Sequence, residues 1–352
     1  MARNIMFSGG IPADGPEGVF ALLAETTGDR ALSWPDGETN EERRGWIGAL
    51  NRVVFPAVPC FEPAPEDPER VDGRTASSTR LLTIREGATV DLRGHLPYAH
   101  DAIASYEVFS RLKAEGKVPA GTRFQVSVPG AHDVVSITFP NHDEWPAVIA
   151  AWQEALQDEF RKILEVIPAE ELTVQLDFCT ELIHIGGEWA KLMSWVPDLP
   201  SDELFELYTS LDYLAPHFAG LPNEVRIGFH VCCGTSPYFP VQPLDTIELP
   251  VRLSNAIQAS LGGRVDYVHL PAMQDSGEAY FAPLADLTIG DATVYLGLEC
   301  NDGLEAMTRR IEAARPALAD FGVAHYCGYF WNKEIMPDLM ATLAAGADVA
   351  AA

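Results

Sequence analysis

Residues 226–235 read RIGFHVCCGT, an apolar run that ends in His230, Val231 and Cys232. In an extended strand, residues i and i+2 point to the same side, so the imidazole of His230 and the thiol of Cys232 can bind one ion without distorting the backbone. Cys233 then points away from them. The stretch therefore predicts a buried strand that carries a pair of metal ligands at its C-terminal end.

A second apolar run, VAHYCGYFW at 323–331, contains Cys327 followed by Gly328. A thiolate from this distant strand would raise the number of protein ligands to three. Three ligands are typical of a catalytic zinc that keeps its fourth position open, whereas a structural zinc is normally closed by four. We predict a Zn²⁺ site formed by His230, Cys232 and Cys327. Taken singly, a His or Cys on a buried strand is more often a packed core residue. The joint pattern favours a metal site.

Short apolar runs alternate with longer amphipathic segments along most of the chain. The strand candidates are residues 4–8, 31–35, 122–128, 172–178, 226–232, 266–271, 293–299 and 323–330. The helix candidates are residues 17–27, 41–54, 99–115, 145–166, 202–218, 253–261, 304–321 and 333–344. Eight alternating units predict an α/β fold of the (β/α)8 barrel class, with residues 1–352 forming one catalytic domain.

Residues 56–94 interrupt this alternation, since they are dense in Pro and charge. The runs RLLTI (80–84) and ATVDL (88–92) suggest a small hairpin. We expect an insertion after the second helix that folds over one end of the barrel. The alanine-rich tail from Ala344 is expected to be frayed.

The composition excludes several classes of protein. The chain has 352 residues and a formal net charge of -27, which repels nucleic acid and anionic membrane surfaces. No run reaches the roughly 20 apolar residues of a membrane span, and the N-terminus lacks a signal-peptide pattern. Six cysteines in a chain of this length do not form a disulfide framework. We therefore expect a cytoplasmic protein; its oligomeric state cannot be read from the sequence.

In barrels of this class, the residues that act on substrate lie at the C-terminal ends of the strands. By this rule, further side chains are expected at the same mouth, either as catalytic groups or in substrate binding. Asp177, His269, Glu299 and His325 are the candidate catalytic residues, and Gln175, Asp177 and Asp36 the candidate substrate-binding residues. Glu38, which follows Asp36 in SWPDGET, could join them at the mouth. The alternative for the carboxylates is a structural role at a strand end. For the two histidines it is a supporting or structural role.

With these motifs in place, the chain resembles the family of cobalamin-independent methionine synthases, in the superfamily that includes uroporphyrinogen decarboxylase and the zinc enzyme that joins epoxides to coenzyme M. The resemblance rests on FSGGIPADGPEGVFALL (7–23), VQLDF (174–178), FHVCC (229–233) and HYCGYF (325–330). It corresponds to the C-terminal catalytic domain of the long methionine synthases. It implies zinc ligation by His230, Cys232 and Cys327, and contact of Asp177 with an amino group of the substrate.

Zinc at such a site favours thiol chemistry, because coordination deprotonates a thiol while leaving its sulfur nucleophilic. Our first hypothesis is transfer of a methyl or other alkyl group to a small thiol. Asp177 and Glu299 would orient the thiol, and His269 or His325 would donate a proton. The second hypothesis is a zinc-dependent lyase or hydrolase. The third is a metal-free enzyme like uroporphyrinogen decarboxylase. The identity of the thiol and of the donor stays open.

Overall fold

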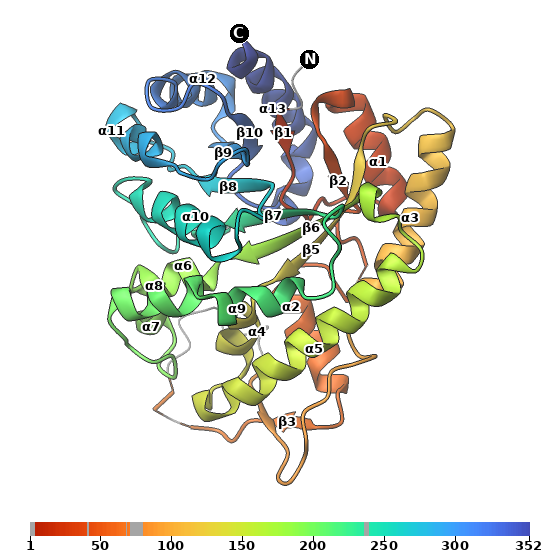
Figure 1. Ribbon diagram of the computed structural model, residues 1–352, viewed down its shortest axis with the longest axis vertical. Coiled ribbons are helices and arrows are strands. Elements are labelled where there is room, and N and C mark those ends of the chain that lie inside the picture. Colours follow the sequence, from red (N-terminus) through yellow and green to blue (C-terminus); the bar gives the residue numbers. More distant parts are fainter. Residues whose placement is uncertain (1–3, 41, 68, 71–79, 236–238) are drawn as a thin grey trace.

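A parallel eight-stranded sheet forms the centre of the computed structural model, which describes residues 4–40, 42–67, 69–70, 80–235 and 239–352 (Figure 1). The strands are β1 (Ile5–Met6), β2 (Ser33–Pro35), β5 (Arg123–Pro129), β6 (Leu172–Phe178), β7 (Arg226–Val231), β8 (Tyr267–Pro271), β9 (Thr293–Glu299) and β10 (Gly322–His325). They pair in the order β1-β10-β9-β8-β7-β6-β5-β2. A parallel bridge from Ile5 to Ala31, just before β2, joins the two ends of the sheet. The predicted (β/α)8 barrel is confirmed.

Each of the eight predicted strands is present, and β6 and β9 match their predicted ranges to the residue. The eighth strand is shorter than predicted, since β10 ends at His325 and residues 326–329 form the turn into η8 (Phe330–Ile335). Cys327 therefore lies in a loop after the strand. Cys327 and His325 are therefore not related by the alternation of side chains along a strand. A hydrogen bond between the His325 ring and the carbonyl of Cys327 relates them instead.

Helices surround the sheet (Figure 1). The predicted helices appear as α1 (Gly15–Thr26), α3 (Tyr98–Ala114), α5 (Trp145–Leu164), α8 (Ser201–Thr209) with α9 (Leu211–Leu214) and η6 (Ala215–Phe218), α10 (Glu248–Ser260), α12 (Gly303–Ala314) and α13 (Met336–Ala351). The second predicted helix is irregular: α2 (Ile47–Ala49) continues into a π-helical turn, η2 (Leu50–Val54), and a 3-10 turn, η3 (Phe55–Ala57). Its predicted start at Glu41 lies outside the described residues.

Four short helices were not predicted: α4 (Ala131–Thr138), α6 (Thr180–Ile185), α7 (Glu188–Leu192) and α11 (Glu278–Phe281). They lie in the connections after β5, β6 and β8. Every residue of α4 and of α6 is buried, so neither helix has the polar face that makes a helix visible as an amphipathic pattern. Shorter 3-10 turns complete the connections: η1 (Gly28–Arg30), η4 (His142–Glu144), η5 (Ala169–Glu171) and η7 (Ala282–Asp286).

The C-terminal tail is not frayed, which corrects the expectation from its alanine content. Helix α13 continues to Ala351 and buries Leu343, Gly346 and Ala347. The side-chain amide of Asn4 donates to the carbonyl of Ala347 at 2.7 Å. The small side chains allow the helix to pack closely against the strands, and this packing offsets the loss of chain entropy.

The inserted segment contains an antiparallel pair, but its strands differ from those predicted. β4 (Leu82–Ile84), within the predicted RLLTI run, pairs with β3 (Phe61–Pro63) and not with residues 88–92. The ring of Phe61 packs on that of Phe139 at 4.8 Å, so the pair lies beside the connection between β5 and α5. The partner of β4 thus lies earlier in the insertion, and local sequence does not show it. Residues 68 and 71–79 of the predicted insertion lie outside the described part.

The interior of the barrel is polar. Gln175, fully buried, donates to the carbonyl of Ser8 at 2.7 Å and to Asp177 Oδ1 at 2.8 Å, and it accepts from Tyr267 at 3.0 Å. Tyr267 fits because its neighbour Gly228 has no side chain: a Cβ there would overlap the Tyr267 ring. This hydrogen-bonded column fixes the carboxyl group of Asp177 at the top of the barrel.

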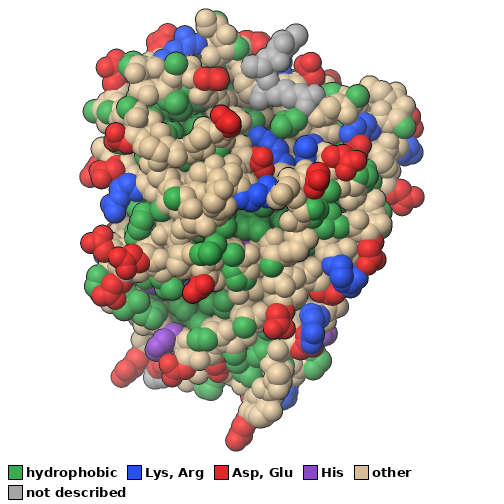
Figure 2. Space-filling model, viewed as in Figure 1, with side chains coloured by type: hydrophobic (Ala, Val, Ile, Leu, Met, Phe, Trp, Pro, Cys, Tyr) green, Lys and Arg blue, Asp and Glu red, His purple; other side chains and the backbone are tan. Residues whose placement is uncertain are grey.

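Acidic side chains are scattered over the surface, with fewer Lys and Arg among them, in keeping with the net charge of -27 (Figure 2). Among the described residues, no helix is both long and apolar enough to cross a membrane.

Candidate functional site

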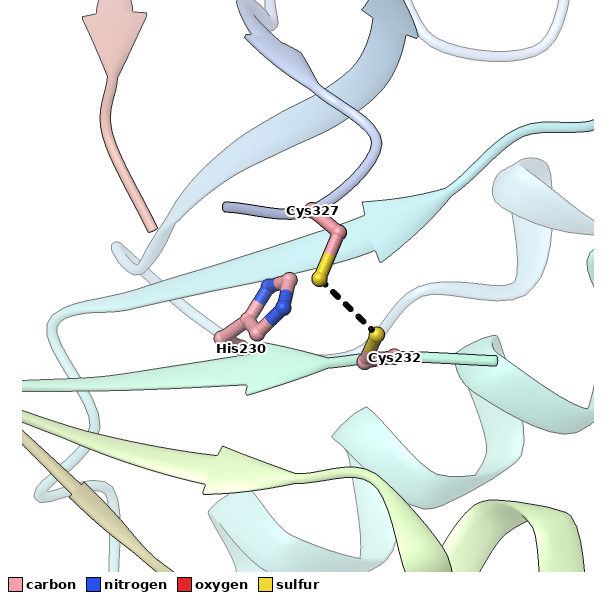
Figure 3. A group of neighbouring side chains, drawn as sticks. All are labelled: His230, Cys232 and Cys327. Carbon is pink, nitrogen blue, oxygen red and sulfur yellow. Dashed lines mark hydrogen bonds between the residues drawn. The ribbon is translucent and has the colours of Figure 1, made fainter. Parts of the chain in front are cut away.

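Three potential metal ligands meet at the C-terminal ends of the barrel strands. His230 lies near the end of β7, Cys232 follows that strand, and Cys327 comes from the loop after β10 (Figure 3). One ligand atom from each residue lies within 4.8 Å of the other two, and the two sulfur atoms are 3.6 Å apart. Residues separated by 95 positions in the chain therefore converge, as the sequence predicted for a shared ion.

This donor set fits zinc. In an ideal tetrahedral site with metal–sulfur bonds near 2.3 Å, two thiolates lie about 3.8 Å apart. The observed separation of 3.6 Å is close to this value. The contact with Cys232, followed by burial, raises the pKa of the Cys327 thiol well above its usual range. Two adjacent thiols, of which Cys232 is buried and Cys327 partly buried, cannot both ionise unless a cation compensates their charge. Soft sulfur donors with one imidazole are the ligands that zinc prefers.

His269 lies directly behind His230. The two residues are register partners in β7 and β8, their rings stack at 4.6 Å, and their Nδ1 atoms are 2.6 Å apart. Burial, and then the neighbouring His230, lower the pKa of His269 well below its usual value, so His269 is neutral. Its Nδ1 can accept the Nδ1 proton of His230. This leaves Nε2 of His230 as the nitrogen that can bind a metal.

His325 and Glu299 lie behind Cys327. The Nδ1–H group of His325 donates to the carbonyl of Cys327 at 2.6 Å, which fixes the loop that carries the thiol. Its Nε2 is 3.4 Å from Glu299 Oε2 and 2.9 Å from Asn301 Oδ1. Burial lowers the pKa of His325 to about 4 and raises that of Glu299 to about 7. These shifts favour the neutral forms of both side chains, and Glu299 Oε2 makes no hydrogen bond within the described part of the chain. Both side chains lie outside the cavity described next.

A cavity of about 100 Å³ opens in front of the three ligands. Its wall includes Asp177, which is 5% exposed and lies beside His230 in the register of β6 and β7. Burial, and then the nearby Glu38 carboxyl, raise the pKa of Asp177 well above its usual range. The other residues in the wall are Ser8, Gly10, Glu38, Gly45, Trp46, Cys179, Thr235, Gly328 and Phe330. A small molecule in this cavity would contact both Asp177 and the metal ligands.

Asp36 does not line this cavity. Its carboxylate accepts from Arg43 at 2.7 Å and from Ser105 at 2.9 Å, so the structure gives it a role in holding Arg43. Glu38, two residues later, lines the cavity instead. Burial raises the pKa of Glu38 to about 7, although Arg43 nearby opposes the shift.

Sequence reasoning missed several wall residues. Cys179 shows no partner pattern in the sequence. It follows β6 and lines the cavity together with Cys232. The backbone N–H of Cys232 donates to the carbonyl of Phe178, the residue before Cys179, at 3.2 Å. Trp46 and Phe330 come from irregular segments that no periodicity identifies. The segment SWPDGET after β2 was the one local signal, and it correctly pointed to Glu38. There the chain turns at Gly37 and Glu38, whose φ angles are positive, 80° and 54°.

Backbone strain gathers around this site. Among the described residues, three that are not glycine have positive φ: Glu38 (54°), Trp46 (56°) and Asn301 (62°). Glu38 and Trp46 line the cavity, and Asn301 contacts His325. Such conformations cost of order 1–3 kcal/mol each and cluster at functional sites. In addition, Ser8 Oγ and Trp46 Nε1 are buried without a hydrogen-bond partner in the described part of the chain. Unpaired polar atoms of this kind suit a ligand.

Comparisons with known proteins support the fold. No protein-family model matches the sequence, and no curated protein sequence matches it. Among solved structures, a B12-independent methionine synthase from Shewanella sp. W3-18-1, in complex with selenomethionine, is similar with a TM-score of 0.63 and 12% identity, covering 99% of this chain and 98% of that one. A candidate vitamin-B12 independent methionine synthase from Listeria monocytogenes is similar with a TM-score of 0.55 and 17% identity, covering 95% of this chain and 86% of that one. At these identities the likeness establishes a shared fold.

Proposed function

We propose that this protein is a zinc-dependent enzyme that transfers a methyl or other alkyl group to a small-molecule thiol. The observation that carries the proposal is the convergence of His230, Cys232 and Cys327 on one point at the barrel mouth, beside a cavity. The similarity in fold to proteins named as methionine synthases supports the same class of reaction. Because thiol ligands must stay reduced, the proposal includes a reducing compartment such as the cytoplasm.

His230 Nε2 and the two sulfurs would hold the zinc. When bound, zinc lowers the pKa of a coordinated thiol, so that the thiol is ionised at neutral pH. The chain's own residues prepare the site. His269 holds the proton of His230 Nδ1, and His325 holds the carbonyl of Cys327. We assign both histidines a positioning role in preference to proton donation, because neither lines the cavity. Glu299, whose Oε2 lies 3.4 Å from His325 Nε2, would act on the site only through His325.

Asp177 is the residue proposed to contact the substrate. Gln175 holds one of its carboxyl oxygens, so Asp177 presents a fixed acceptor to the cavity, 2.8 Å from its partner. Gln175 itself is buried in the barrel and acts through Asp177. Asp36 would act more remotely, through Arg43 and Glu38.

The two rival hypotheses fit the site less well. Two thiolate ligands lower the Lewis acidity that a zinc lyase or hydrolase needs. A decarboxylase acting on a polyanionic tetrapyrrole needs basic side chains, and the described residues of the cavity wall include no Lys or Arg.

The test is metal analysis of the purified protein. We expect about one zinc per chain. Cys232→Ser and Cys327→Ser should lose most of this zinc and the methyl-transfer activity. Cys60→Ser, in the inserted segment, is the matched control and should keep both. Added thiol should contribute a further sulfur at about 2.3 Å in X-ray absorption. A protein without zinc, or serine variants that keep zinc and activity, would refute the proposal.

A further inference from the structure

We propose that the alkyl donor of this enzyme is an alkylated onium cation, a sulfonium or quaternary ammonium compound without a carboxylate, bound between Glu38, Asp177, Trp46 and Phe330. The transfer step rests on the proposed function above. The binding of the cation does not, because it depends on the cavity wall alone.

The charges of the wall favour a cation. Glu38 and Asp177 both line the cavity, whereas the described wall residues include no Lys or Arg. The guanidinium of Arg43 is bound to Asp36 at 2.7 Å and lies 3.9 Å from Glu38. That of Arg52 lies behind the wall, where a Cβ placed on Gly45 would be 3.7 Å from its Nη2. A positively charged ligand would favour the ionised forms of the Glu38 and Asp177 carboxyl groups, and a carboxylate on the ligand would find no basic partner in the described wall.

The shape of the wall favours a cation without N–H groups. Trp46 and Phe330 supply aromatic rings to the same wall as Glu38 and Asp177. A methyl group placed on Gly10 would be 3.5 Å from Glu38 Oε2 and 3.8 Å from Cβ of Phe330, and one placed on Gly45 would be 3.6 Å from the Phe330 ring. Aromatic rings beside carboxylates are the setting in which proteins bind alkylated ammonium groups.

A ligand is indicated independently of these charges. Ser8 is 7% exposed and lines the cavity, and its hydroxyl has no hydrogen-bond partner among the described residues. Trp46 adds an unpartnered ring N–H, held in a backbone conformation of φ 56°. These two neutral donors can bind a hydroxyl or an ether oxygen on the donor molecule. They cannot replace the Arg or Lys that a carboxylate would require.

The chemistry balances without another reactant. The thiol gives its proton to solvent, and its sulfur attacks the methyl carbon of the onium ion. A new carbon–sulfur bond forms as the old bond to the onium centre breaks, and that bond's electron pair stays on the leaving sulfur or nitrogen. The products are a thioether and a neutral sulfide or amine. Charge is neutralised in this step, which a largely apolar cavity favours.

Binding is tested by calorimetry on the full-length protein. No thiol is added, so that no methyl group can be transferred from the probe. Choline should bind at least about tenfold more tightly than its neutral isostere 3,3-dimethylbutan-1-ol, and more tightly than glycine betaine, which carries a carboxylate. Glu38→Gln, Trp46→Leu and Phe330→Leu should each weaken choline binding several-fold. Glu305→Gln, on the exposed face of α12, is the control and should leave it unchanged. Circular dichroism verifies that each variant folds.

Transfer is tested with trimethylsulfonium, choline and glycine betaine as methyl donors to 2-mercaptoethanol. Methylation from trimethylsulfonium alone assigns the donor to the sulfonium class, and methylation from choline assigns it to the ammonium class. Equal binding of choline and its neutral isostere, or choline binding unaffected by all three wall variants, would overturn the inference while leaving zinc and thiol binding intact. Onium binding in a protein that holds no zinc would uphold the cation site and refute the proposed function.

Discussion

Replacing His269 separates a positioning role from simple packing. His269→Leu removes the acceptor for the His230 Nδ1 proton but keeps a side chain of similar size. His269→Asn keeps a side-chain acceptor near the place of Nδ1, which lies 2.6 Å from His230 Nδ1. We expect the leucine variant to bind zinc more weakly, and the asparagine variant to remain close to the native protein.

The magnitude follows from the geometry. With His269 in place, the Nδ1 proton of His230 has one partner, and Nε2 is free for the metal. Without it, the ring can rotate or adopt the other tautomer. Loss of such a supporting hydrogen bond typically weakens metal binding 10–100-fold, or about 1.4–2.7 kcal/mol. Because His269 is fully buried, the leucine also removes the unfavourable burial of a polar ring, so folding should be preserved.

Zinc affinity is measured by competition with a chromophoric chelator at fixed pH, and folding by the midpoint of urea unfolding of the metal-free protein. The reasoning is refuted if His269→Leu binds zinc as tightly as the native protein. It is also refuted if the asparagine and leucine variants lose affinity equally while both fold normally, since the acceptor would then be irrelevant.

Two further predictions concern stability. The pKa of Glu38 is raised from 4.5 to about 7, so its favourable contribution is present below pH 4.5 and is lost as pH rises through 7. Between pH 5 and 8 the unfolding free energy of the native protein should therefore fall by up to about 3 kcal/mol relative to Glu38→Gln, and identical pH slopes in urea titrations would contradict this. Gly228→Ala would force a methyl group into the ring of Tyr267 and should destabilise the fold by about 2–3 kcal/mol or more, whereas Gly277→Ala, which meets no atom within 4 Å, should be nearly neutral in the same titrations.

The barrel and the convergence of the ligands could be predicted because both depend on short-range patterns. A buried parallel strand is a continuous apolar run, and β6 and β9 were predicted to the residue for this reason. The spacing of His230 and Cys232 determines that their side chains share one face, and the barrel then brings Cys327 to the same mouth. Each of these steps needs only the order of elements along the chain.

Other features depend on contacts that local sequence does not contain. Helices α4 and α6 are buried on all sides and lack an amphipathic period. β4 pairs with β3, which lies about 20 residues earlier and packs through Phe61 on Phe139, and not with the adjacent run at 88–92. The last helix, α13, stays regular because its buried face packs against the strands, although its alanine content suggested fraying. In each case tertiary contacts override a local preference.

The cavity wall was the least predictable part of the site, and a physical reason connects its members. Glu38 and Trp46 follow β2 and have positive φ angles. Steric clashes disfavour this conformation for residues with a side chain, so no sequence pattern predicts it here. The surrounding structure must therefore hold them, as Arg43 does by binding Asp36 at 2.7 Å within the same segment. Such contacts let the fold tolerate the strain, and strained backbone of this kind clusters at functional sites. Strand geometry thus places the candidate ligand His230, whereas Glu38 and Trp46 depend on a loop that tertiary contacts hold in a strained conformation.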